Sequence, residues 1–234
     1  MARTSCLFFN IVQYNPCCAN TNDRVLDIAG GLPRRDIIGL IGTQKKSSGD
    51  LTEDYHMADE YWCIPFGYKS SVHVNKSCGV TLMLRRGRIK KQHVVRIFEV
   101  PKYLWGRCAA VIITVGLIKL AILLMYFPPR QRGAAARIKS EKTADTMCHW
   151  LKGILQQLRT CHQLFLLSDL NDGLRHDPED GCCGTYETGR ENHTAQQLKP
   201  ILSGHGITSF GTHFKAPPSW IGETVQKTSD HIFG

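Results

Sequence analysis

An apolar segment in the middle of the chain constrains the fold most, because residues 109–127 are long enough to cross a bilayer. The segment is rich in β-branched residues, and Gly116 followed by Lys119 divides it. A lysine near the middle of a membrane helix would cost roughly 3 kcal/mol on insertion scales. We therefore expect two buried strands, 109–115 and 118–127, joined by a tight turn, with a transmembrane helix as the alternative.

The composition is that of a globular protein rather than a disordered or collagen-like one. The chain has 234 residues, of which 42% are hydrophobic and 21% charged, so it can bury a sizeable core. Glycine (21 residues) and proline (10 residues) are near average usage, which disfavours long linkers. We expect a single domain over residues 1–234.

Hydrophobic periodicity predicts strands and helices on both sides of the apolar segment. The predicted strands are 7–14, 36–43, 78–84, 93–100, 163–169, 207–214, 219–222 and 228–233. The predicted helices are 22–32, 139–158 and 192–202, with Pro200 expected to kink or shorten the last one. The strand–helix–strand unit from 7 to 43 favours two neighbouring strands of one sheet. Since both sheet faces are apolar, we expect an α/β sandwich of two packed sheets with helices outside.

The charge balance favours a polyanionic partner. Lysine plus arginine (29) exceed aspartate plus glutamate (20), which gives a formal charge of +9 and a pI near 9.1. Nucleic acid is therefore the leading partner class, with no membrane partner expected. The excess is concentrated at residues 34–35, 45–46, 85–91 and 130–132, although each run alone is also typical of a solvated loop.

The ten cysteines form no metal-binding pattern. They include no Cys-x-x-Cys, and Cys148-His149 and Cys161-His162 are the nearest approach to a ligand set. Chance neighbours in a packed core explain these pairs better than a zinc site. The first ten residues hold an apolar run too short for a secretory signal. We therefore expect reduced thiols and an intracellular protein, in the nucleus or cytoplasm.

Polar residues follow several apolar strands, where a cleft would form. An Asp and an Asn two residues apart at the end of a buried strand point to the same side. A carboxylate there can hold a water or a metal ion, and an amide can orient a phosphate. An ordinary turn is the alternative, because both residue types favour turns. The residues in such positions are Asn15, Tyr126, Asp169, Asn171, Asp230 and His231.

Eight short segments, in chain order, resemble the endonuclease/exonuclease/phosphatase superfamily, which has the DNase I-like fold. They are residues 7–15 ending in Tyr-Asn for Trp-Asn, DIIGLIGT (36–43) for DIIGLQET, GVTLMLR (79–85) for GVAILVR, Gly106-Arg107, MYFPP (125–129) for YAPP, LLSDLN (166–171) for GDFN, Glu191-Asn192, and SWIGETVQKTSDHIF (219–233) for TW…IDYIF. The chain is most similar to endonuclease domains of LINE-type retrotransposons and to craniofacial-development-protein-like relatives. The resemblance implies a four-layer α/β/β/α sandwich.

The resemblance also implies metal-assisted hydrolysis of a phosphodiester or phosphomonoester, usually with Mg²⁺. The implied substrate is nucleic acid, with DNA as the leading candidate. Asn15 is similar to the family's asparagine beside the metal and the phosphate. Asp169 is similar to the aspartate that positions the attacking water or assists the leaving group, and it is the second implied metal-site residue. Tyr126 is similar to the phosphate-contacting tyrosine, and Asn171 to its phosphate-orienting asparagine.

The first departure from the family pattern removes a metal ligand. The family's metal-binding glutamate falls on Gly42, which supplies no donor atom. Asp50, Glu53 or Asp54 in the following loop are the candidates to replace it, although nothing in the spacing requires this.

The second departure concerns the end of the chain. Ser229-Asp230-His231 spells the family's Ser-Asp-His motif, but it stands where the family has its IDYIF strand. On that alignment Asp230 is the aspartate that orients the catalytic histidine, and that histidine is missing. The alternative is that His231 is itself the catalytic histidine. We expect a domain that lacks its C-terminal strands, and either a nuclease-fold hydrolase with weak or no activity or a catalytically inactive module that binds nucleic acid.

Overall fold

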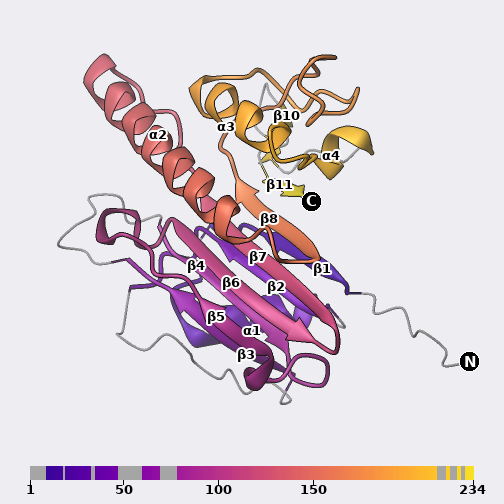
Figure 1. Cartoon of the computed structure of the whole chain (residues 1–234). Helices are drawn as coiled ribbons and strands as arrows, with labels where there is room; N and C mark the ends of the chain where they lie inside the picture. The colour runs from indigo at the N-terminus through magenta and orange to yellow at the C-terminus, as the bar shows by residue number, and fades with distance from the viewer. Residues whose placement is uncertain are drawn as a thin grey trace, which may run out of the picture.

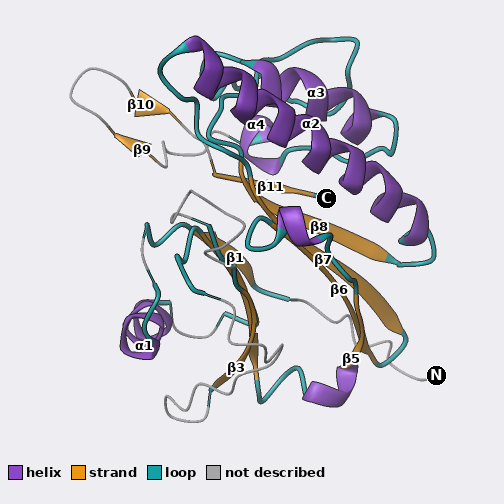
Figure 2. Ribbon diagram, turned by 90° about the vertical axis from the view of Figure 1, so that its left-hand side faces the viewer, coloured by secondary structure: helices purple, strands orange, loops and turns teal. Residues whose placement is uncertain are grey.

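The chain folds into two β-sheets packed face to face, with one helix on one outer face and two longer helices on the other (Figures 1 and 2). The computed structural model describes residues 9–17, 19–32, 35–46, 60–68, 78–214, 220–221, 226–227 and 230–234. The four-layer α/β/β/α sandwich expected from the sequence is confirmed.

The smaller sheet has the strand order β1-β2-β4-β3. Its strands are β1 (Ile11–Tyr14), β2 (Ile37–Ile41), β3 (Tyr61–Phe66) and β4 (Val80–Arg85). β1 and β2 are parallel and are joined by α1 (Asn22–Gly31), so the predicted strand–helix–strand unit is confirmed. The hydroxyl of Thr21 caps α1 by accepting the N–H of Arg24 at 3.3 Å.

The larger sheet has the order β11-β8-β7-β6-β5. Its strands are β5 (Val94–Ile97), β6 (Cys108–Val115), β7 (Ile118–Tyr126), β8 (Gln163–Asp169) and β11 (Asp230–Phe233). β6 and β7 form an antiparallel hairpin that turns at Gly116, whose φ of 59° suits a tight turn. The two-strand interpretation of residues 109–127 is therefore confirmed, and the transmembrane alternative is wrong. None of the helices that the structure describes could span a membrane.

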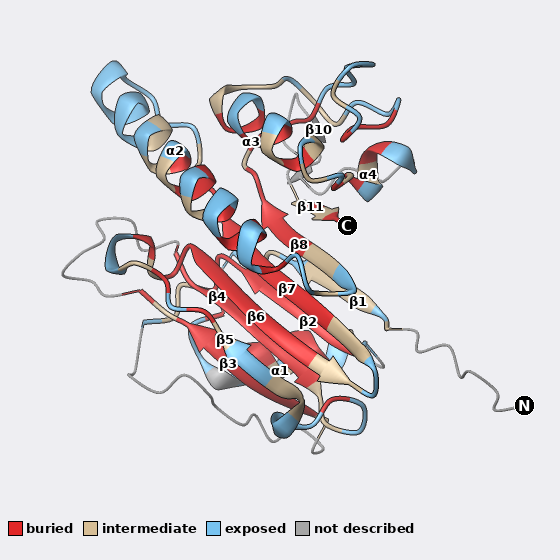
Figure 3. Ribbon diagram, in the orientation of Figure 1, coloured by how far each residue is buried: buried red, intermediate tan, exposed pale blue. Residues whose placement is uncertain are grey.

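The two sheets approach each other closely at Gly39 in β2. A Cβ atom at this position would lie 2.6 Å from Cδ1 of Leu167 in β8 and 2.8 Å from Cδ2 of Leu124 in β7. Most residues of β2, β4, β6 and β7 are buried, as the red strands of Figure 3 show. This close packing keeps the ends of β1 and β8 near each other, although they belong to different sheets.

Two helices cover the outer face of the larger sheet. α2 (Ala134–Gln157) connects the parallel strands β7 and β8 and buries Met147 and Leu151. α3 (His193–Ser203) packs beside α2 and buries Leu198. Pro200 does not shorten α3, which continues to Ser203.

Some elements differ from the sequence-based expectation. β3 was not among the predicted strands. It contains Pro65, which is tolerated because β3 lies at the edge of the sheet. The strand predicted over 207–214 is wrong: after Ser209 bridges to Phe233, the chain turns into the short helix α4 (Phe210–His213). Short elements complete the fold, namely the 3-10 helices η1 (Lys91–His93) and η2 (Lys102–Leu104) and the strands β9 (Trp220–Ile221) and β10 (Gln226–Lys227).

Candidate catalytic site

The end of β1 meets the end of β8 through a direct hydrogen bond between side chains. Asn15 follows β1, and its Nδ2 donates to Oδ2 of Asp169, the last residue of β8, at 2.7 Å across 154 positions of sequence. Asp169 is 2% exposed. Two residues from different sheets are thus joined at one end of the sandwich, and sequence analysis had singled out both of them.

Asn171 lies beside this pair and orients the turn after β8. Its backbone N–H donates to Oδ1 of Asp169 at 2.9 Å, and its Nδ2 donates to the carbonyl oxygen of Phe127 at 2.9 Å. Its φ is 52°, in the left-handed region that asparagine tolerates better than most residues. Both oxygens of Asp169 are therefore held by amide hydrogens.

Tyr126 is the neighbour of Asp169 in the parallel pairing of β7 with β8. Tyr126 is 6% exposed, and its ring lies against Arg107, whose guanidinium carbon is 5.5 Å from the ring centroid. Arg107 also donates from Nη1 to the Tyr126 carbonyl oxygen at 3.1 Å, and it is only 5% exposed. The structure thus adds a buried positive charge that sequence analysis gave no role.

Asp230 and His231 lie on opposite faces of β11. Asp230 pairs with Asp169 across the antiparallel β8–β11 ladder, and its Oδ1 accepts a 2.9 Å hydrogen bond from Nε2 of Gln13 in β1. His231 pairs with Ser168, and its ring lies 5.7 Å from that of Phe233, which packs on the side of α2 and α3. Since side chains alternate along a strand, Asp230 faces the smaller sheet near Asn15 and His231 points to the other side. His231 is 1% exposed there.

We call Asn15, Tyr126, Asp169 and Asn171 the strand-end cluster. The structure brings these four residues together, with Asp230 beside them, whereas it places the His231 side chain elsewhere. Nothing in the sequence marked Arg107 as a buried cation; the only available signal was its position after Gly106, just before a strand.

Position 42 borders the strand-end cluster. Gly42 follows β2 with a φ of +78°, and a Cβ atom built there would lie 3.0 Å from Oδ1 of Asn15. A side chain at this position would therefore enter the cluster, but in a backbone conformation that L-residues rarely adopt. The backbone N–H groups of Gly42 and Thr43 both donate to the carbonyl oxygen of Gly79 at 2.9 Å, which fixes this loop.

The residues present do not fit a preformed Mg²⁺ site. Asp169 supplies one carboxylate with both oxygens engaged, and Oδ1 of Asn15 already accepts the N–H of Cys17 at 2.9 Å. Gly42 adds no donor atom. The replacement ligands suggested by the sequence, Asp50, Glu53 and Asp54, lie outside the described residues.

A grouping of possible metal ligands lies away from the strand-end cluster. Asp180, Cys182 and Cys183 form the one such group found in the described part of the chain. However, the carboxylate of Asp180 contacts the ammonium of Lys199 at 2.6 Å and accepts the N–H groups of both cysteines. The Lys199 ammonium group therefore already neutralises this carboxylate, which leaves it poorly suited to bind a metal ion. At the Cys148-His149 pair, burial raises the pKa of the Cys148 thiol to about 12, which keeps it protonated and a poor metal ligand.

The basic runs are unevenly placed around the strand-end cluster. Lys45 and Lys46 follow the loop at Gly42, and Arg130 and Arg132 follow Tyr126. The run at 85–91 follows β4. Leu84 of β4 pairs with Ile37 at the start of β2, whereas Gly42 follows the end of β2, so this run lies at the far end of the sheet. Two basic runs therefore follow segments that reach the cluster, and one lies at the far end of the sheet. Arg34 lies outside the described residues.

No family model matches the chain, and no curated protein matches it in sequence. Solved structures do match. The endonuclease domain of TRAS1, a telomere-specific non-LTR retrotransposon, has a TM-score of 0.56 and 12% identity, over 95% of this chain and 83% of that one. The AP endonuclease LMAP from Leishmania major has a TM-score of 0.67 and 11% identity, over 95% of this chain and 78% of that one. These likenesses show that the chain has the DNase I-like endonuclease fold.

Proposed function

We propose that this chain is a phosphodiesterase domain that binds nucleic acid and hydrolyses it slowly. DNA is the leading candidate substrate. The observation that carries the proposal is the hydrogen bond from Asn15 to Asp169, which joins the two sheets at one end where Tyr126 and Asn171 also lie. The strand ends of a sandwich with this fold are where a shared phosphate site is expected. The similarity of the fold to a retrotransposon endonuclease domain and to an AP endonuclease also supports the proposal.

Each residue of the strand-end cluster has a proposed part in hydrolysis. Asp169, fixed by Asn15 and Asn171, positions the water that attacks phosphorus and accepts its proton. Tyr126 contacts a non-bridging phosphate oxygen, and the buried charge of Arg107 beside it favours the negative charge that develops there. Asp230 supports this arrangement through Gln13, whose Nε2 donates both to Oδ1 of Asp230 and to the carbonyl oxygen of Ser168 in β8.

Two features support a low rate. Gly42 leaves the position beside Asn15 without a carboxylate, and the His231 side chain is on the face away from Asp169. These same features favour a second candidate function, a module of the same fold that binds nucleic acid without turnover.

The proposed compartment is the nucleus or cytoplasm. The cysteines that the structure describes form no disulfide with one another, and the thiol sulfurs of Cys182 and Cys183 are 3.5 Å apart. This arrangement is consistent with a reducing environment.

Two assays run in parallel separate the two functions. Nicking of supercoiled plasmid with Mg²⁺ measures turnover, and fluorescence anisotropy of labelled DNA in EDTA measures binding. We expect binding in EDTA together with slow nicking that is lost in Asp169→Ala. Asp27→Ala, which removes an exposed carboxylate from α1, is the matched control and should leave both signals unchanged. Binding without any nicking would support the inactive module, and the absence of both would contradict the proposal.

A further inference from the structure

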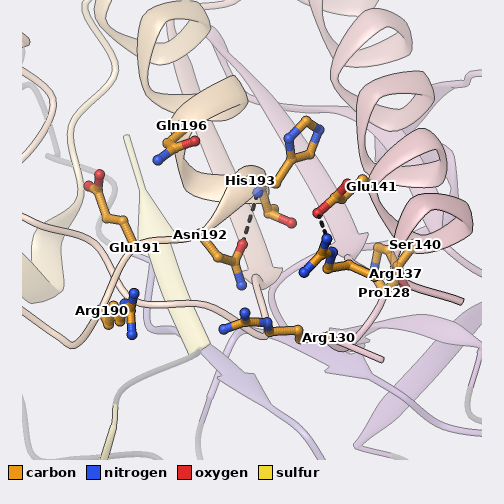
Figure 4. A pocket seen from close by; sticks show the side chains of 11 residues that line it. Pro128, Arg130, Arg137, Ser140, Glu141, Arg190, Glu191, Asn192, His193 and Gln196 are labelled. Carbon is orange, nitrogen blue, oxygen red and sulfur yellow. Dashed lines mark hydrogen bonds and ion pairs between the residues drawn. The ribbon is translucent and has the colours of Figure 1, made fainter. Parts of the chain in front are cut away.

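A cavity of about 300 Å³ opens between α2 and α3 (Figure 4). Its walls come from the loop after β7, with Pro128 and Arg130, from the first turns of α2, with Arg137, and from the segment that leads into α3, with Arg190 and Asn192. In Figure 4 the side chains of Arg130 and Arg190 lie on the same side of this space, below Asn192.

The charges that line the cavity do not cancel. Of its two glutamates, Glu141 pairs with Arg137 at 3.7 Å. Glu191 is bound to Nζ of Lys199 at 2.9 Å. Arg130 and Arg190 are exposed, and neither makes an ion pair or a side-chain hydrogen bond with any residue that the structure describes. Two guanidinium groups are therefore left to bind an anion.

The N-terminus of α3 does not provide this site, because three amide groups there already have side-chain partners. Oδ2 of Asp172 accepts the N–H groups of Asn192 and Ala195, and Oδ1 of Asn192 accepts the N–H of Thr194. The two arginines are thus the groups that would hold the ligand. Planar guanidinium groups with several donors match phosphate oxygens well.

Chain neighbours and hydrogen bonds link the cavity to the strand-end cluster. Pro128 follows Phe127, whose carbonyl oxygen accepts the side-chain N–H of Asn171 at 2.9 Å. On the other wall, Asp172, the residue after Asn171, holds the start of α3. Both walls of the cavity are therefore linked to the strand-end cluster by short stretches of chain and by hydrogen bonds.

We infer that Arg130 and Arg190 bind a second phosphate group of the nucleic acid in this cavity, separate from the phosphate at the strand-end cluster. The inference rests on the proposed function, since it assigns a further binding site for the same substrate. The phosphate is either an internal backbone group or a terminal monophosphate, and both present the same oxygens to the arginines.

The test removes both charges in one variant, Arg130→Gln/Arg190→Gln. The matched control is Arg24→Gln/Arg159→Gln, which removes the same charge from exposed positions on α1 and beyond the far end of α2. Anisotropy in EDTA measures DNA affinity across a salt series. We expect the first variant to bind about tenfold more weakly, with a slope of log K against log salt that is about one unit smaller than that of the parent chain. The control should lose much less.

Two oligonucleotide arms identify the source of the phosphate. Equal weakening for single strands with and without a 5′-phosphate assigns a backbone group, and weakening only for the phosphorylated strand assigns the terminal group. Equal losses in the Arg130/Arg190 variant and in the control would overturn the inference, while the nicking lost in Asp169→Ala would still support the proposed function.

Calorimetric titration with inorganic pyrophosphate distinguishes a failure of this inference from a failure of the proposed function. If the chain binds no nucleic acid, the proposed function fails. The cavity is then an anion site only if the parent chain binds pyrophosphate and Arg130→Gln/Arg190→Gln does not. Pyrophosphate binding that is the same in both proteins would overturn the inference.

Discussion

Asp172 accepts the backbone N–H of Ala195 at 3.1 Å, so the loop that follows β8 also holds the first turn of α3. The same carboxylate accepts the N–H groups of Asn192 at 3.0 Å and of Gly173 at 2.9 Å. Asn171, the preceding residue, belongs to the strand-end cluster. One short loop therefore connects the candidate catalytic site with the cavity that contains Arg130 and Arg190.

Asp172 should make stability depend on pH. Burial raises its pKa to about 6, although hydrogen bonds from Ala195, Asn192 and Gly173 act in the opposite direction. An unfolded aspartate ionises near pH 3.9, so between about pH 4 and 6 the folded chain holds a proton that the unfolded chain has lost. This contribution to the free energy of unfolding should therefore fall as the pH rises from 4 to 6, by at most about 3 kcal/mol, and then level off.

Urea denaturation of the parent chain and of Asp172→Asn across this pH range measures that contribution. The difference in free energy of unfolding between the two proteins should change most between pH 4 and 6. A difference that stays constant across the range would show that Asp172 ionises normally in the folded chain.

Asn171 should be replaced more easily by glycine than by alanine. Both substitutions remove the hydrogen bond to the Phe127 carbonyl, but glycine adopts a φ of 52° without strain. We expect Asn171→Ala to lower the free energy of unfolding by about 2 kcal/mol and Asn171→Gly by roughly 1 kcal/mol. Equal losses, measured by thermal unfolding, would mean that the left-handed backbone does not limit this position.

Gly42→Glu should strengthen Mg²⁺ binding at a cost in stability. The side chain would enter beside Oδ1 of Asn15, but at a φ of +78°. Gly42→Ala carries the same backbone strain of about 1 kcal/mol without the carboxylate, so it is the matched control. Calorimetric titration should show tighter Mg²⁺ binding in Gly42→Glu than in Gly42→Ala, with both proteins less stable than the parent chain. Equal Mg²⁺ affinity in the two variants would show that a carboxylate at position 42 supplies no ligand for Mg²⁺.

Lys199 should be essential for the stability of the region around α3. Lys199 is 8% exposed, and its ammonium group contacts Asp180 at 2.6 Å and Glu191 at 2.9 Å. Lys199→Met leaves both carboxylates without this partner, and we expect a loss of about 3 kcal/mol in the free energy of unfolding. Lys152→Met, an exposed lysine on α2, should change stability by less than about 0.5 kcal/mol. Similar losses in the two variants would contradict the buried ion pair.

The sequence predicted the elements whose pattern is local. Gly116 and Lys119 marked the β6–β7 hairpin, and the apolar run that ends at Asp169 marked β8. The pairing of Asn15 with Asp169 followed only from the order of the motifs, because no local pattern joins residues so distant in sequence.

Other features depend on tertiary packing that the sequence does not show. His231 is adjacent to Asp230, but the alternation of side chains in β11 places the two on opposite faces. Arg107 is polar and gave no sign that it would be buried under Tyr126. The cavity is lined by Arg130 and Arg190 from loops 60 residues apart in the chain, which no spacing rule predicts.

The central claim is that Asn15 and Asp169 act together on one phosphate. The most direct measurement is the plasmid-nicking rate, with enzyme in excess over plasmid, of the parent chain, Asn15→Ala, Asp169→Ala and the double variant. Residues that act as a unit have non-additive effects, so we predict that the double variant is no slower than Asp169→Ala alone. Losses that multiply, or a parent rate equal to that of Asp169→Ala, would contradict the claim.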